Sequence, residues 1–186
     1  LVISNPDCYK GEPFSVSLNA GAKLIAVDPR LTRIAARADV WLQLRPGTDT
    51  ALALGMLNVI VNEKLYDGDF VEKHVYGWQP FVKRVNEYPV EKVAEITWVP
   101  EEKIRQAARL FATTRPAAIQ WGVAIEQQTT CADNNRALMA LMGITGNIDA
   151  PGGQERGHVA PPRERAGGEG VPPAGRAGEA GGESLG

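Results

Sequence analysis

The sequence predicts an α/β fold, with a parallel sheet covered by helices on both faces and a disordered C-terminal tail. Three observations predict it. Short apolar runs end in turn-forming residues, as buried parallel strands do. Longer stretches between these runs carry the start and stop signals of helices. The composition then changes sharply after Pro151, which separates a predicted domain from the tail.

The N-terminal part alternates predicted strands with short helices. The run Leu1-Val2-Ile3 ends at Ser4-Asn5-Pro6, a turn signal, and indicates the last half of a buried strand. Lys23-Leu24-Ile25-Ala26-Val27 is apolar and stops at Asp28-Pro29, as a buried parallel strand would. In chain order the predicted elements are a strand at 1–3, a helix at 13–20, a strand at 23–27, a short helix at 33–38 and a strand at 40–44.

The remainder is mostly helical, with one further strand. Thr48 or Asp49 is expected to cap a long helix, since a side-chain oxygen there can accept from free N–H groups. That helix is apolar almost all round, which predicts burial in the body of the fold. The further predicted elements are helices at 50–63, 69–74, 79–87, 90–96 and 100–113, a strand at 117–121, and a helix at 134–144 ended by Gly146. This order favours a Rossmann-like, three-layer arrangement.

Length and charge restrict the class of protein. The chain has 186 residues, 44% hydrophobic, with 20 Lys+Arg against 22 Asp+Glu, so no basic surplus favours nucleic acid as a partner. No apolar run approaches the roughly 20 residues that span a bilayer, which predicts no direct membrane insertion. The chain lacks an initiating Met and a basic leader, so we expect a fragment entered within a domain. We expect a cytoplasmic location by default, or a periplasmic one if upstream residues carry an export signal.

The last 35 residues differ from the rest. They contain 11 of the 20 Gly and none of the Trp, Tyr or Phe residues, so they cannot bury enough apolar surface to offset the entropy of ordering. We therefore predict a domain at 1–153 and a disordered tail rich in Gly, Pro, Ala and Arg at 154–186. The same bias fits a GC-rich gene translated in another frame, and both interpretations stay open.

Polar residues follow the predicted strands at the edge where open parallel sheets bind ligands. The two carboxylate oxygens of Asp28 match the paired donors of a guanine edge or a ribose diol, although Asp-Pro is also an ordinary turn opener. Gly47-Thr48-Asp49 lies at a predicted helix N-terminus, where free N–H groups favour anions and polar ligand atoms. Its alternative role is a plain helix cap.

Residue patterns for catalysis or metal binding are lacking in the sequence. There is no GxGxxG or GxxxxGK[ST] motif, so simple dinucleotide or P-loop binding is unsupported. His74 and His158 have no second ligand at metal spacing, and Cys8 and Cys131 have no identifiable partner. From the residues alone we predict a ligand-binding α/β domain with no catalytic or metal-ligating residue.

A set of short segments recurs, in the same order, in one family of proteins. The segments are Ser4-Asn5-Pro6, Gly21 to Arg30, Ala38-Asp39, Arg45 to Asp49, Gln120-Trp121-Gly122, Thr145 to Ile148 and Pro151-Gly152-Gly153. Each segment is short, and the ordered set is what makes the resemblance specific. Over nearly all of residues 1–153, the sequence is similar to an interior section of the molybdopterin oxidoreductases of the dimethyl sulfoxide reductase family.

The resemblance implies cofactor-binding roles at matching positions. Ser4 and Asn5 match a loop that touches the dinucleotide, and Gln127 lies where a cofactor-contacting Gln is found. Val123 and Ala124 replace the Met-Gly that is common after the Trp-Gly pair. The residues that match guanosine-binding segments are Asp28, Pro29, Arg30, Thr32, Gly47, Thr48 and Asp49.

The resemblance also implies the cofactor and the partners. The family binds molybdenum or tungsten through two molybdopterin guanine dinucleotides and performs two-electron redox or oxygen-atom transfer. The metal ligand and any iron–sulfur cluster are expected upstream or in a partner subunit. The expected partners are the remainder of the catalytic subunit and an iron–sulfur electron-transfer subunit, and the chain alone is expected to be inactive. The alternatives are a non-catalytic nucleotide-binding domain and a scaffold domain.

Overall fold

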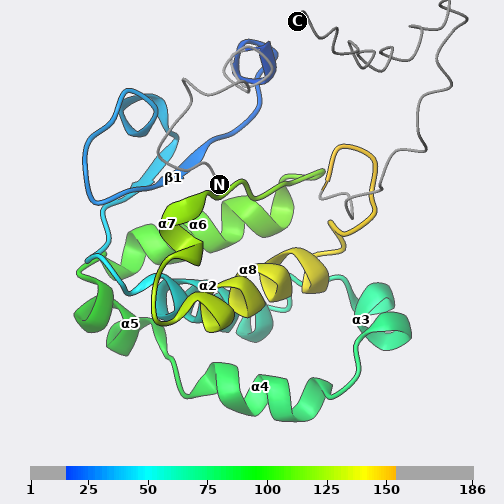
Figure 1. The fold of residues 1–186 in the computed structure, drawn as a ribbon. Helices are drawn as coiled ribbons and strands as arrows, with labels where there is room; N and C mark the ends of the chain where they lie inside the picture. The colour runs from blue at the N-terminus through cyan, green and yellow to red at the C-terminus, as the bar shows by residue number, and fades with distance from the viewer. Residues whose placement is uncertain (1–15, 154–186) are drawn as a thin grey trace, which may run out of the picture. The chain divides into compact units, whose positions relative to one another are not determined.

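The computed structural model describes residues 16–153 (Figure 1). Within this range, β1 (Ile25–Val27) and β2 (Val40–Leu42) form a two-stranded parallel sheet in which Ile25 pairs with Val40 and Val27 with Leu42. The 3-10 helix η1 (Ala35–Arg37) connects them, and residues 16–19 are helical. The strand predicted at 1–3 and the tail predicted at 154–186 lie outside the described residues.

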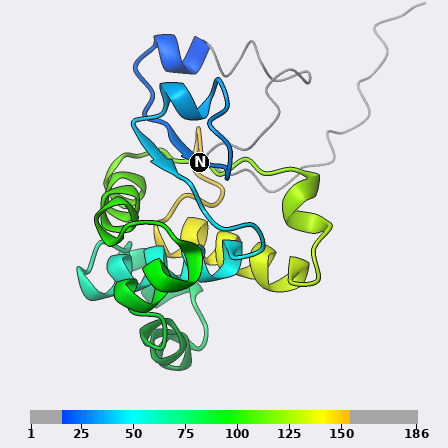
Figure 2. The same ribbon diagram turned by 90° about the vertical axis from the view of Figure 1, so that its left-hand side faces the viewer.

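Both faces of this sheet are apolar, because side chains alternate along a strand. Ile25, Val40 and Leu42 join the main core, whereas Leu24 and Ala26 form a second cluster with residues of η1 and with Leu18. Figure 2 shows η1 and the helical turn at 16–19 on one side of the strands and the longer helices on the other. The α/β class is confirmed, with a small sheet; the Rossmann-like three-layer arrangement stays a prediction.

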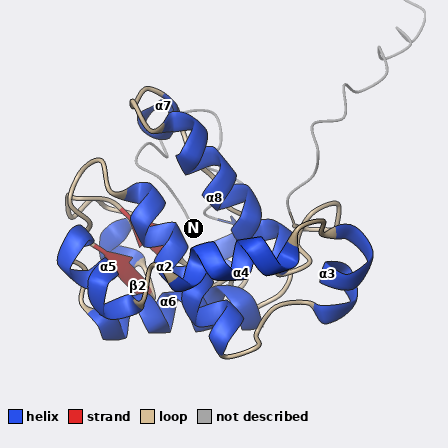
Figure 3. Cartoon of the chain, turned by 90° about the horizontal axis from the view of Figure 1, so that it is seen from below, coloured by secondary structure: helices blue, strands red, loops and turns tan. Residues whose placement is uncertain are grey.

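Seven α-helices follow the sheet within the described residues and dominate the structure (Figure 3). The helix predicted at 50–63 is observed within one residue of both predicted ends. Its neighbours are also close to prediction, except for a short helix at 123–126 that the sequence did not predict. The helices are α2 (Asp49–Asn62), α3 (Gly68–His74), α4 (Trp78–Asn86), α5 (Val90–Thr97), α6 (Glu101–Thr113), α7 (Val123–Glu126) and α8 (Cys131–Ile144).

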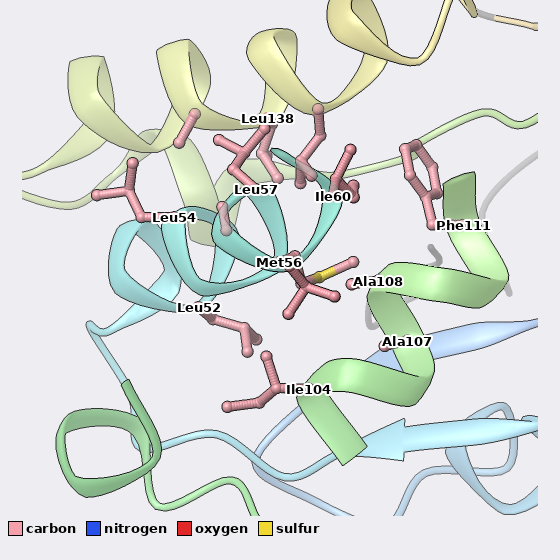
Figure 4. Packing of buried hydrophobic residues seen from close by; sticks show 14 of the residues in the cluster. Leu52, Leu54, Met56, Leu57, Ile60, Ile104, Ala107, Ala108, Phe111 and Leu138 are labelled. Carbon is pink, nitrogen blue, oxygen red and sulfur yellow. The ribbon is translucent and has the colours of Figure 1, made fainter. Parts of the chain in front are cut away.

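Helix α2 lies at the centre of the core and packs against α4, α5, α6 and α8. Ten consecutive residues, 52–61, are buried, which confirms the burial predicted from its all-round apolar character. Figure 4 shows Leu52 and Met56 of α2 directed toward α6, with Leu138 of α8 over the opposite side of the helix. A helix surrounded in this way holds its N-terminus, and hence Asp49, in a fixed position.

The prediction of a strand at 117–121 is wrong: in the described part of the chain these residues do not pair with another strand. The backbone N–H of Ala117 donates to the side-chain Oδ1 of Asn147 at 2.9 Å, so a side chain takes the place of a neighbouring strand. A cavity of about 920 Å³ lies between this segment and the residues around the start of β1. Apolar content alone predicted the strand, and it cannot predict whether a pairing partner is adjacent.

Gly55 permits the close approach of α2 and α5. A Cβ at this position would lie 2.7 Å from Cγ1 and 3.1 Å from Cβ of Val93, a fully buried residue. Gly55→Ala is therefore expected to lower the free energy of unfolding by about 1–2 kcal/mol, since overpacking outweighs the roughly 1 kcal/mol gain in helix propensity. Urea denaturation measures the change. The control is Gly68→Ala in α3, where an added Cβ meets nothing within 4 Å; a stabilised Gly55→Ala variant would contradict the prediction.

Candidate functional site

Asp28 lies at the carboxyl end of β1 and is held there by β2. Its backbone N–H donates to the Leu42 carbonyl at 3.3 Å, and the Trp41 indole Nε1–H donates to the Asp28 carbonyl at 2.9 Å. The Asp28 side chain is buried, at 4% exposure for the residue, and its Oδ1 accepts from the Arg30 backbone N–H at 2.8 Å. The turn interpretation and the ligand interpretation of Asp28 are thus compatible, because this hydrogen bond uses Oδ1.

Asp39 joins the other ends of the two strands. Its Oδ2 accepts from the Leu24 backbone N–H at 2.8 Å and its Oδ1 from Lys23 Nζ at 3.0 Å. The Leu24 N–H and, after it, the Lys23 hydrogen bond lower the pKa of the Asp39 carboxyl below its ordinary value. Asp39 therefore ties the start of β2 to the residues before β1, in the register that places Asp28 at the end of the sheet.

Asp39→Asn is expected to lower stability at pH 7 by less than about 1 kcal/mol, since the carboxylate is partly exposed. A carboxyl whose pKa is lowered in the folded state contributes stability above its unfolded pKa and loses it as pH falls through the folded value. The deficit of the variant should therefore shrink on acidification. Urea midpoints from pH 7 down to pH 3 measure this, with the exposed Asp69→Asn as control; a deficit independent of pH would contradict it.

The loop before α2 brings a second carboxylate toward Asp28. Gly47 has a φ of +83°, a conformation that glycine adopts readily. Thr48 occupies the N-cap position of α2, yet its hydroxyl donates to the Arg45 carbonyl at 2.6 Å and does not accept from the helix. The predicted side-chain cap is therefore wrong for Thr48, and Asp49 lies within the first turn of α2.

Asp49 is half-buried, and its Oδ2 accepts from Gln128 Nε2 at 3.3 Å. Burial raises the pKa of the Asp49 carboxyl above its ordinary value, and the Gln128 hydrogen bond opposes this in part. The charged form of Asp49 is thus less well solvated than it would be in water. A ligand that donates hydrogen bonds to this carboxylate would relieve that deficit.

Asp28 and Asp49 line one cavity of about 240 Å³. Asp28, Pro29 and Arg30 come from the end of β1, and Gly47 and Asp49 come from the start of α2. Apolar side chains of α2, α7 and α8 form most of the remaining wall. They are Leu52, Ala53, Met56, Ala124, Ile125, Leu138 and Leu141.

The other predicted site residues lie elsewhere. Thr32 accepts from the Ala35 backbone N–H at 3.1 Å and so begins η1. Gln127 is exposed at the end of α7, whereas its neighbour Gln128 lines the cavity. Ser4 and Asn5 lie outside the described residues. Sequence reasoning missed Gln128 because the start of α7, which sets the direction of each following side chain, gave no signal.

The described residues contain no group of three His, Cys, Asp or Glu side chains placed to hold a metal ion. Over the same range, no helix combines the length and apolar character required to cross a bilayer. The polar side chains at the cavity are those of Asp28, Arg30, Asp49 and Gln128.

Comparison with known proteins identifies the family. The sequence model of the molybdopterin oxidoreductase family matches residues 13–171, and the chain belongs to this family. The homologues, which include formate dehydrogenases and nitrate reductase, are molybdopterin enzymes of the dimethyl sulfoxide reductase family. The resemblance seen in the sequence is thus confirmed.

Particular relatives cover most of this chain. It is 50% identical over 132 residues to acetylene hydratase of Syntrophotalea acetylenica and 40% identical over 131 residues to formate dehydrogenase H of Escherichia coli (strain K12). These regions are 71% and 70% of this chain and 18% of each relative. The solved structure of acetylene hydratase from Pelobacter acetylenicus matches with a TM-score of 0.73 and 47% identity, covering 74% of this chain and 19% of that one. The chain spans about a fifth of the length of these relatives.

Proposed function

We propose that this chain is a section of the catalytic subunit of an oxidoreductase that carries molybdenum or tungsten on two molybdopterin guanine dinucleotides. In this proposal the cavity between β1 and α2 holds one guanosine. The observation that carries it is the meeting of Asp28 and Asp49 at one small, mostly apolar cavity.

The residues present fit a guanosine. The flat faces of a purine are apolar and suit the side chains of α2 and α8, while its edge needs polar partners. Guanine presents two adjacent N–H donors, which match the two oxygens of one carboxylate. Asp28 or Asp49 can accept them, and the other can accept from ribose. The guanidinium of Arg30, whose side chain is 77% exposed at the cavity rim, can bind a phosphate.

The relatives favour a role in cofactor binding. One matched relative is named a hydratase and another a formate dehydrogenase, so they differ in substrate. A segment that both share is better suited to hold a common cofactor than to select one substrate. When bound, the metal and its pterins would supply the two-electron or oxygen-atom chemistry. The residues described above bind and orient the nucleotide end.

We further propose that the sheet is larger in the intact protein, with the Rossmann-like three-layer arrangement. Within the described residues, β1 pairs with β2 along one edge only. The cavity of about 920 Å³ beside the start of β1 has residues 116–118 and Gln120 on its far wall. Since neighbouring strands lie about 4.8 Å apart, a further strand in this space could pair with β1.

The proposed partners are the remainder of the catalytic subunit, which would supply the metal ligand, and an iron–sulfur electron-transfer subunit. In this proposal the chain alone is inactive. The guanosine site itself is tested by calorimetric titration of the full 186-residue chain with guanosine diphosphate and adenosine diphosphate. The guanosine nucleotide should bind at least about tenfold more tightly, since adenine presents an acceptor where guanine presents a donor.

The role in cofactor binding requires a second experiment. Asp49→Ala in the intact catalytic subunit should lower its pterin content and its activity together. Unchanged pterin content and activity would count against the role of Asp49 in cofactor binding. Tight guanosine diphosphate binding by a protein that takes up no pterin would favour a non-catalytic nucleotide-binding domain. A folded chain with no nucleotide affinity would favour a scaffold.

A further inference from the structure

Gln128 joins two parts of the cavity wall through one amide group. Its Nε2 donates to the Ala124 carbonyl of α7 at 2.6 Å and to Asp49 Oδ2 of α2 at 3.3 Å. Gln128 is half-buried and itself lines the cavity. The position of α7 is therefore linked directly to the carboxylate that faces the ligand space.

A second side-chain amide, which is more deeply buried, also connects α7 with the first turn of α2. Asn134 of α8 is 1% exposed; it accepts from the Thr50 hydroxyl at 2.5 Å and donates through Nδ2 to the Ile125 carbonyl at 3.2 Å. The carbonyls of Ala124 and Ile125 thus each accept from a side-chain amide that is hydrogen-bonded to the first turn of α2. The difference between the two bridges is that only the one made by Gln128 ends on an ionisable group.

We propose that Gln128 is a positioning residue for nucleotide binding. It fixes Oδ2 of Asp49 and the α7 wall relative to each other, so that Asp49 Oδ1 is directed to accept from a ligand. This inference rests on the proposed guanosine site and adds a residue to it. The role predicted for Gln127 from the family resemblance stays a separate prediction.

Other charged groups near Asp49 are few and differently placed. Asp28 and Arg30, from the end of β1, line the same cavity. Glu126 of α7 and Asp133 of α8 are exposed. None of them donates to the Asp49 carboxylate in the hydrogen bonds of the structure, so a change in Asp49 on altering Gln128 is assignable to the Gln128 amide.

The first test needs no ligand. The Asp49 carboxyl carbon is titrated by NMR in the full chain and in Gln128→Ala, with Gln79→Ala, an exposed glutamine on α4, as control. Removing a hydrogen bond to the charged form should raise the Asp49 pKa further in Gln128→Ala and leave it unchanged in Gln79→Ala. An identical titration of Asp49 in the wild type and Gln128→Ala overturns the inference, whether or not nucleotide binds.

The second test measures guanosine diphosphate affinity. Gln128→Ala should weaken binding about tenfold, the value of one hydrogen bond to a charged group. Gln128→Glu, of equal size but without the donor, should weaken it more by adding a like charge. A loss of affinity in Gln127→Ala with none in Gln128→Ala overturns the inference. If the wild-type chain binds no guanosine diphosphate, the proposed function fails in this chain while the NMR titration still decides the role of Gln128.

Discussion

Asp49→Asn is expected to raise stability at pH 7 and to abolish most nucleotide binding. Burial raises the pKa of this carboxyl, and a group of this kind contributes stability below its unfolded pKa that is lost as pH rises through the folded value. The neutral amide avoids that loss and keeps an oxygen for Gln128 Nε2. Its own N–H donors, however, would face those of guanine. We expect a higher urea midpoint at pH 7 and about 100-fold weaker binding of guanosine diphosphate.

The matched control for this variant is Asp133→Asn. Asp133 also lies in the first turn of a helix, α8, but its side chain is 65% exposed. It should change neither binding nor the urea midpoint appreciably. The stabilisation of Asp49→Asn should disappear below about pH 3, about one unit under the ordinary Asp pKa, where Asp49 is protonated in both states. A destabilised Asp49→Asn variant with full affinity would mean that Asp49 serves the fold and not a ligand.

The long-range part of the fold was the harder part to predict from the sequence. Helix α2 was predicted closely because its signals are local: a loop with Pro46 and Gly47, then a stretch in which Asn58 is the one polar residue between Ala51 and Val61. The segment 117–121 has equally apolar residues, yet strand pairing depends on a partner distant in sequence. Here Asn147, some 30 residues further on, takes the N–H of Ala117.

In the candidate site, too, the residues marked by local signals could be predicted, whereas their meeting at one cavity could not. Asp28, Gly47 and Asp49 were predictable, since each follows a strand end or begins a helix, positions that a sequence marks with turn residues. That they share one cavity with α7 and α8 depends on packing around α2. Gln128 was missed for a geometric reason. Gln127 and Gln128 both follow α7, and only the packing of this segment against α2 decides which of the two lines the cavity.

Leu57→Ala is expected to be the most destabilising single change in the core. Leu57 is 0% exposed and lies on α2 among the residues that α8 covers (Figure 4). Truncation removes buried methyl groups and leaves a cavity that the surrounding helices cannot close, at a cost of about 3–4 kcal/mol. The urea midpoint should fall with little change in slope, since the same surface is exposed on unfolding.

The comparison with Leu31→Ala separates packing from side-chain chemistry. Leu31 is 63% exposed, so the identical substitution there should cost less than about 0.5 kcal/mol. Because α2 carries Asp49 at its first residue, loosening its packing at Leu57 should also weaken guanosine diphosphate binding, although residue 57 does not line the cavity. A destabilised Leu57→Ala variant that retains full affinity would show that the N-terminal turn of α2 is held by its own bridges to α7 and α8, independently of the core below it.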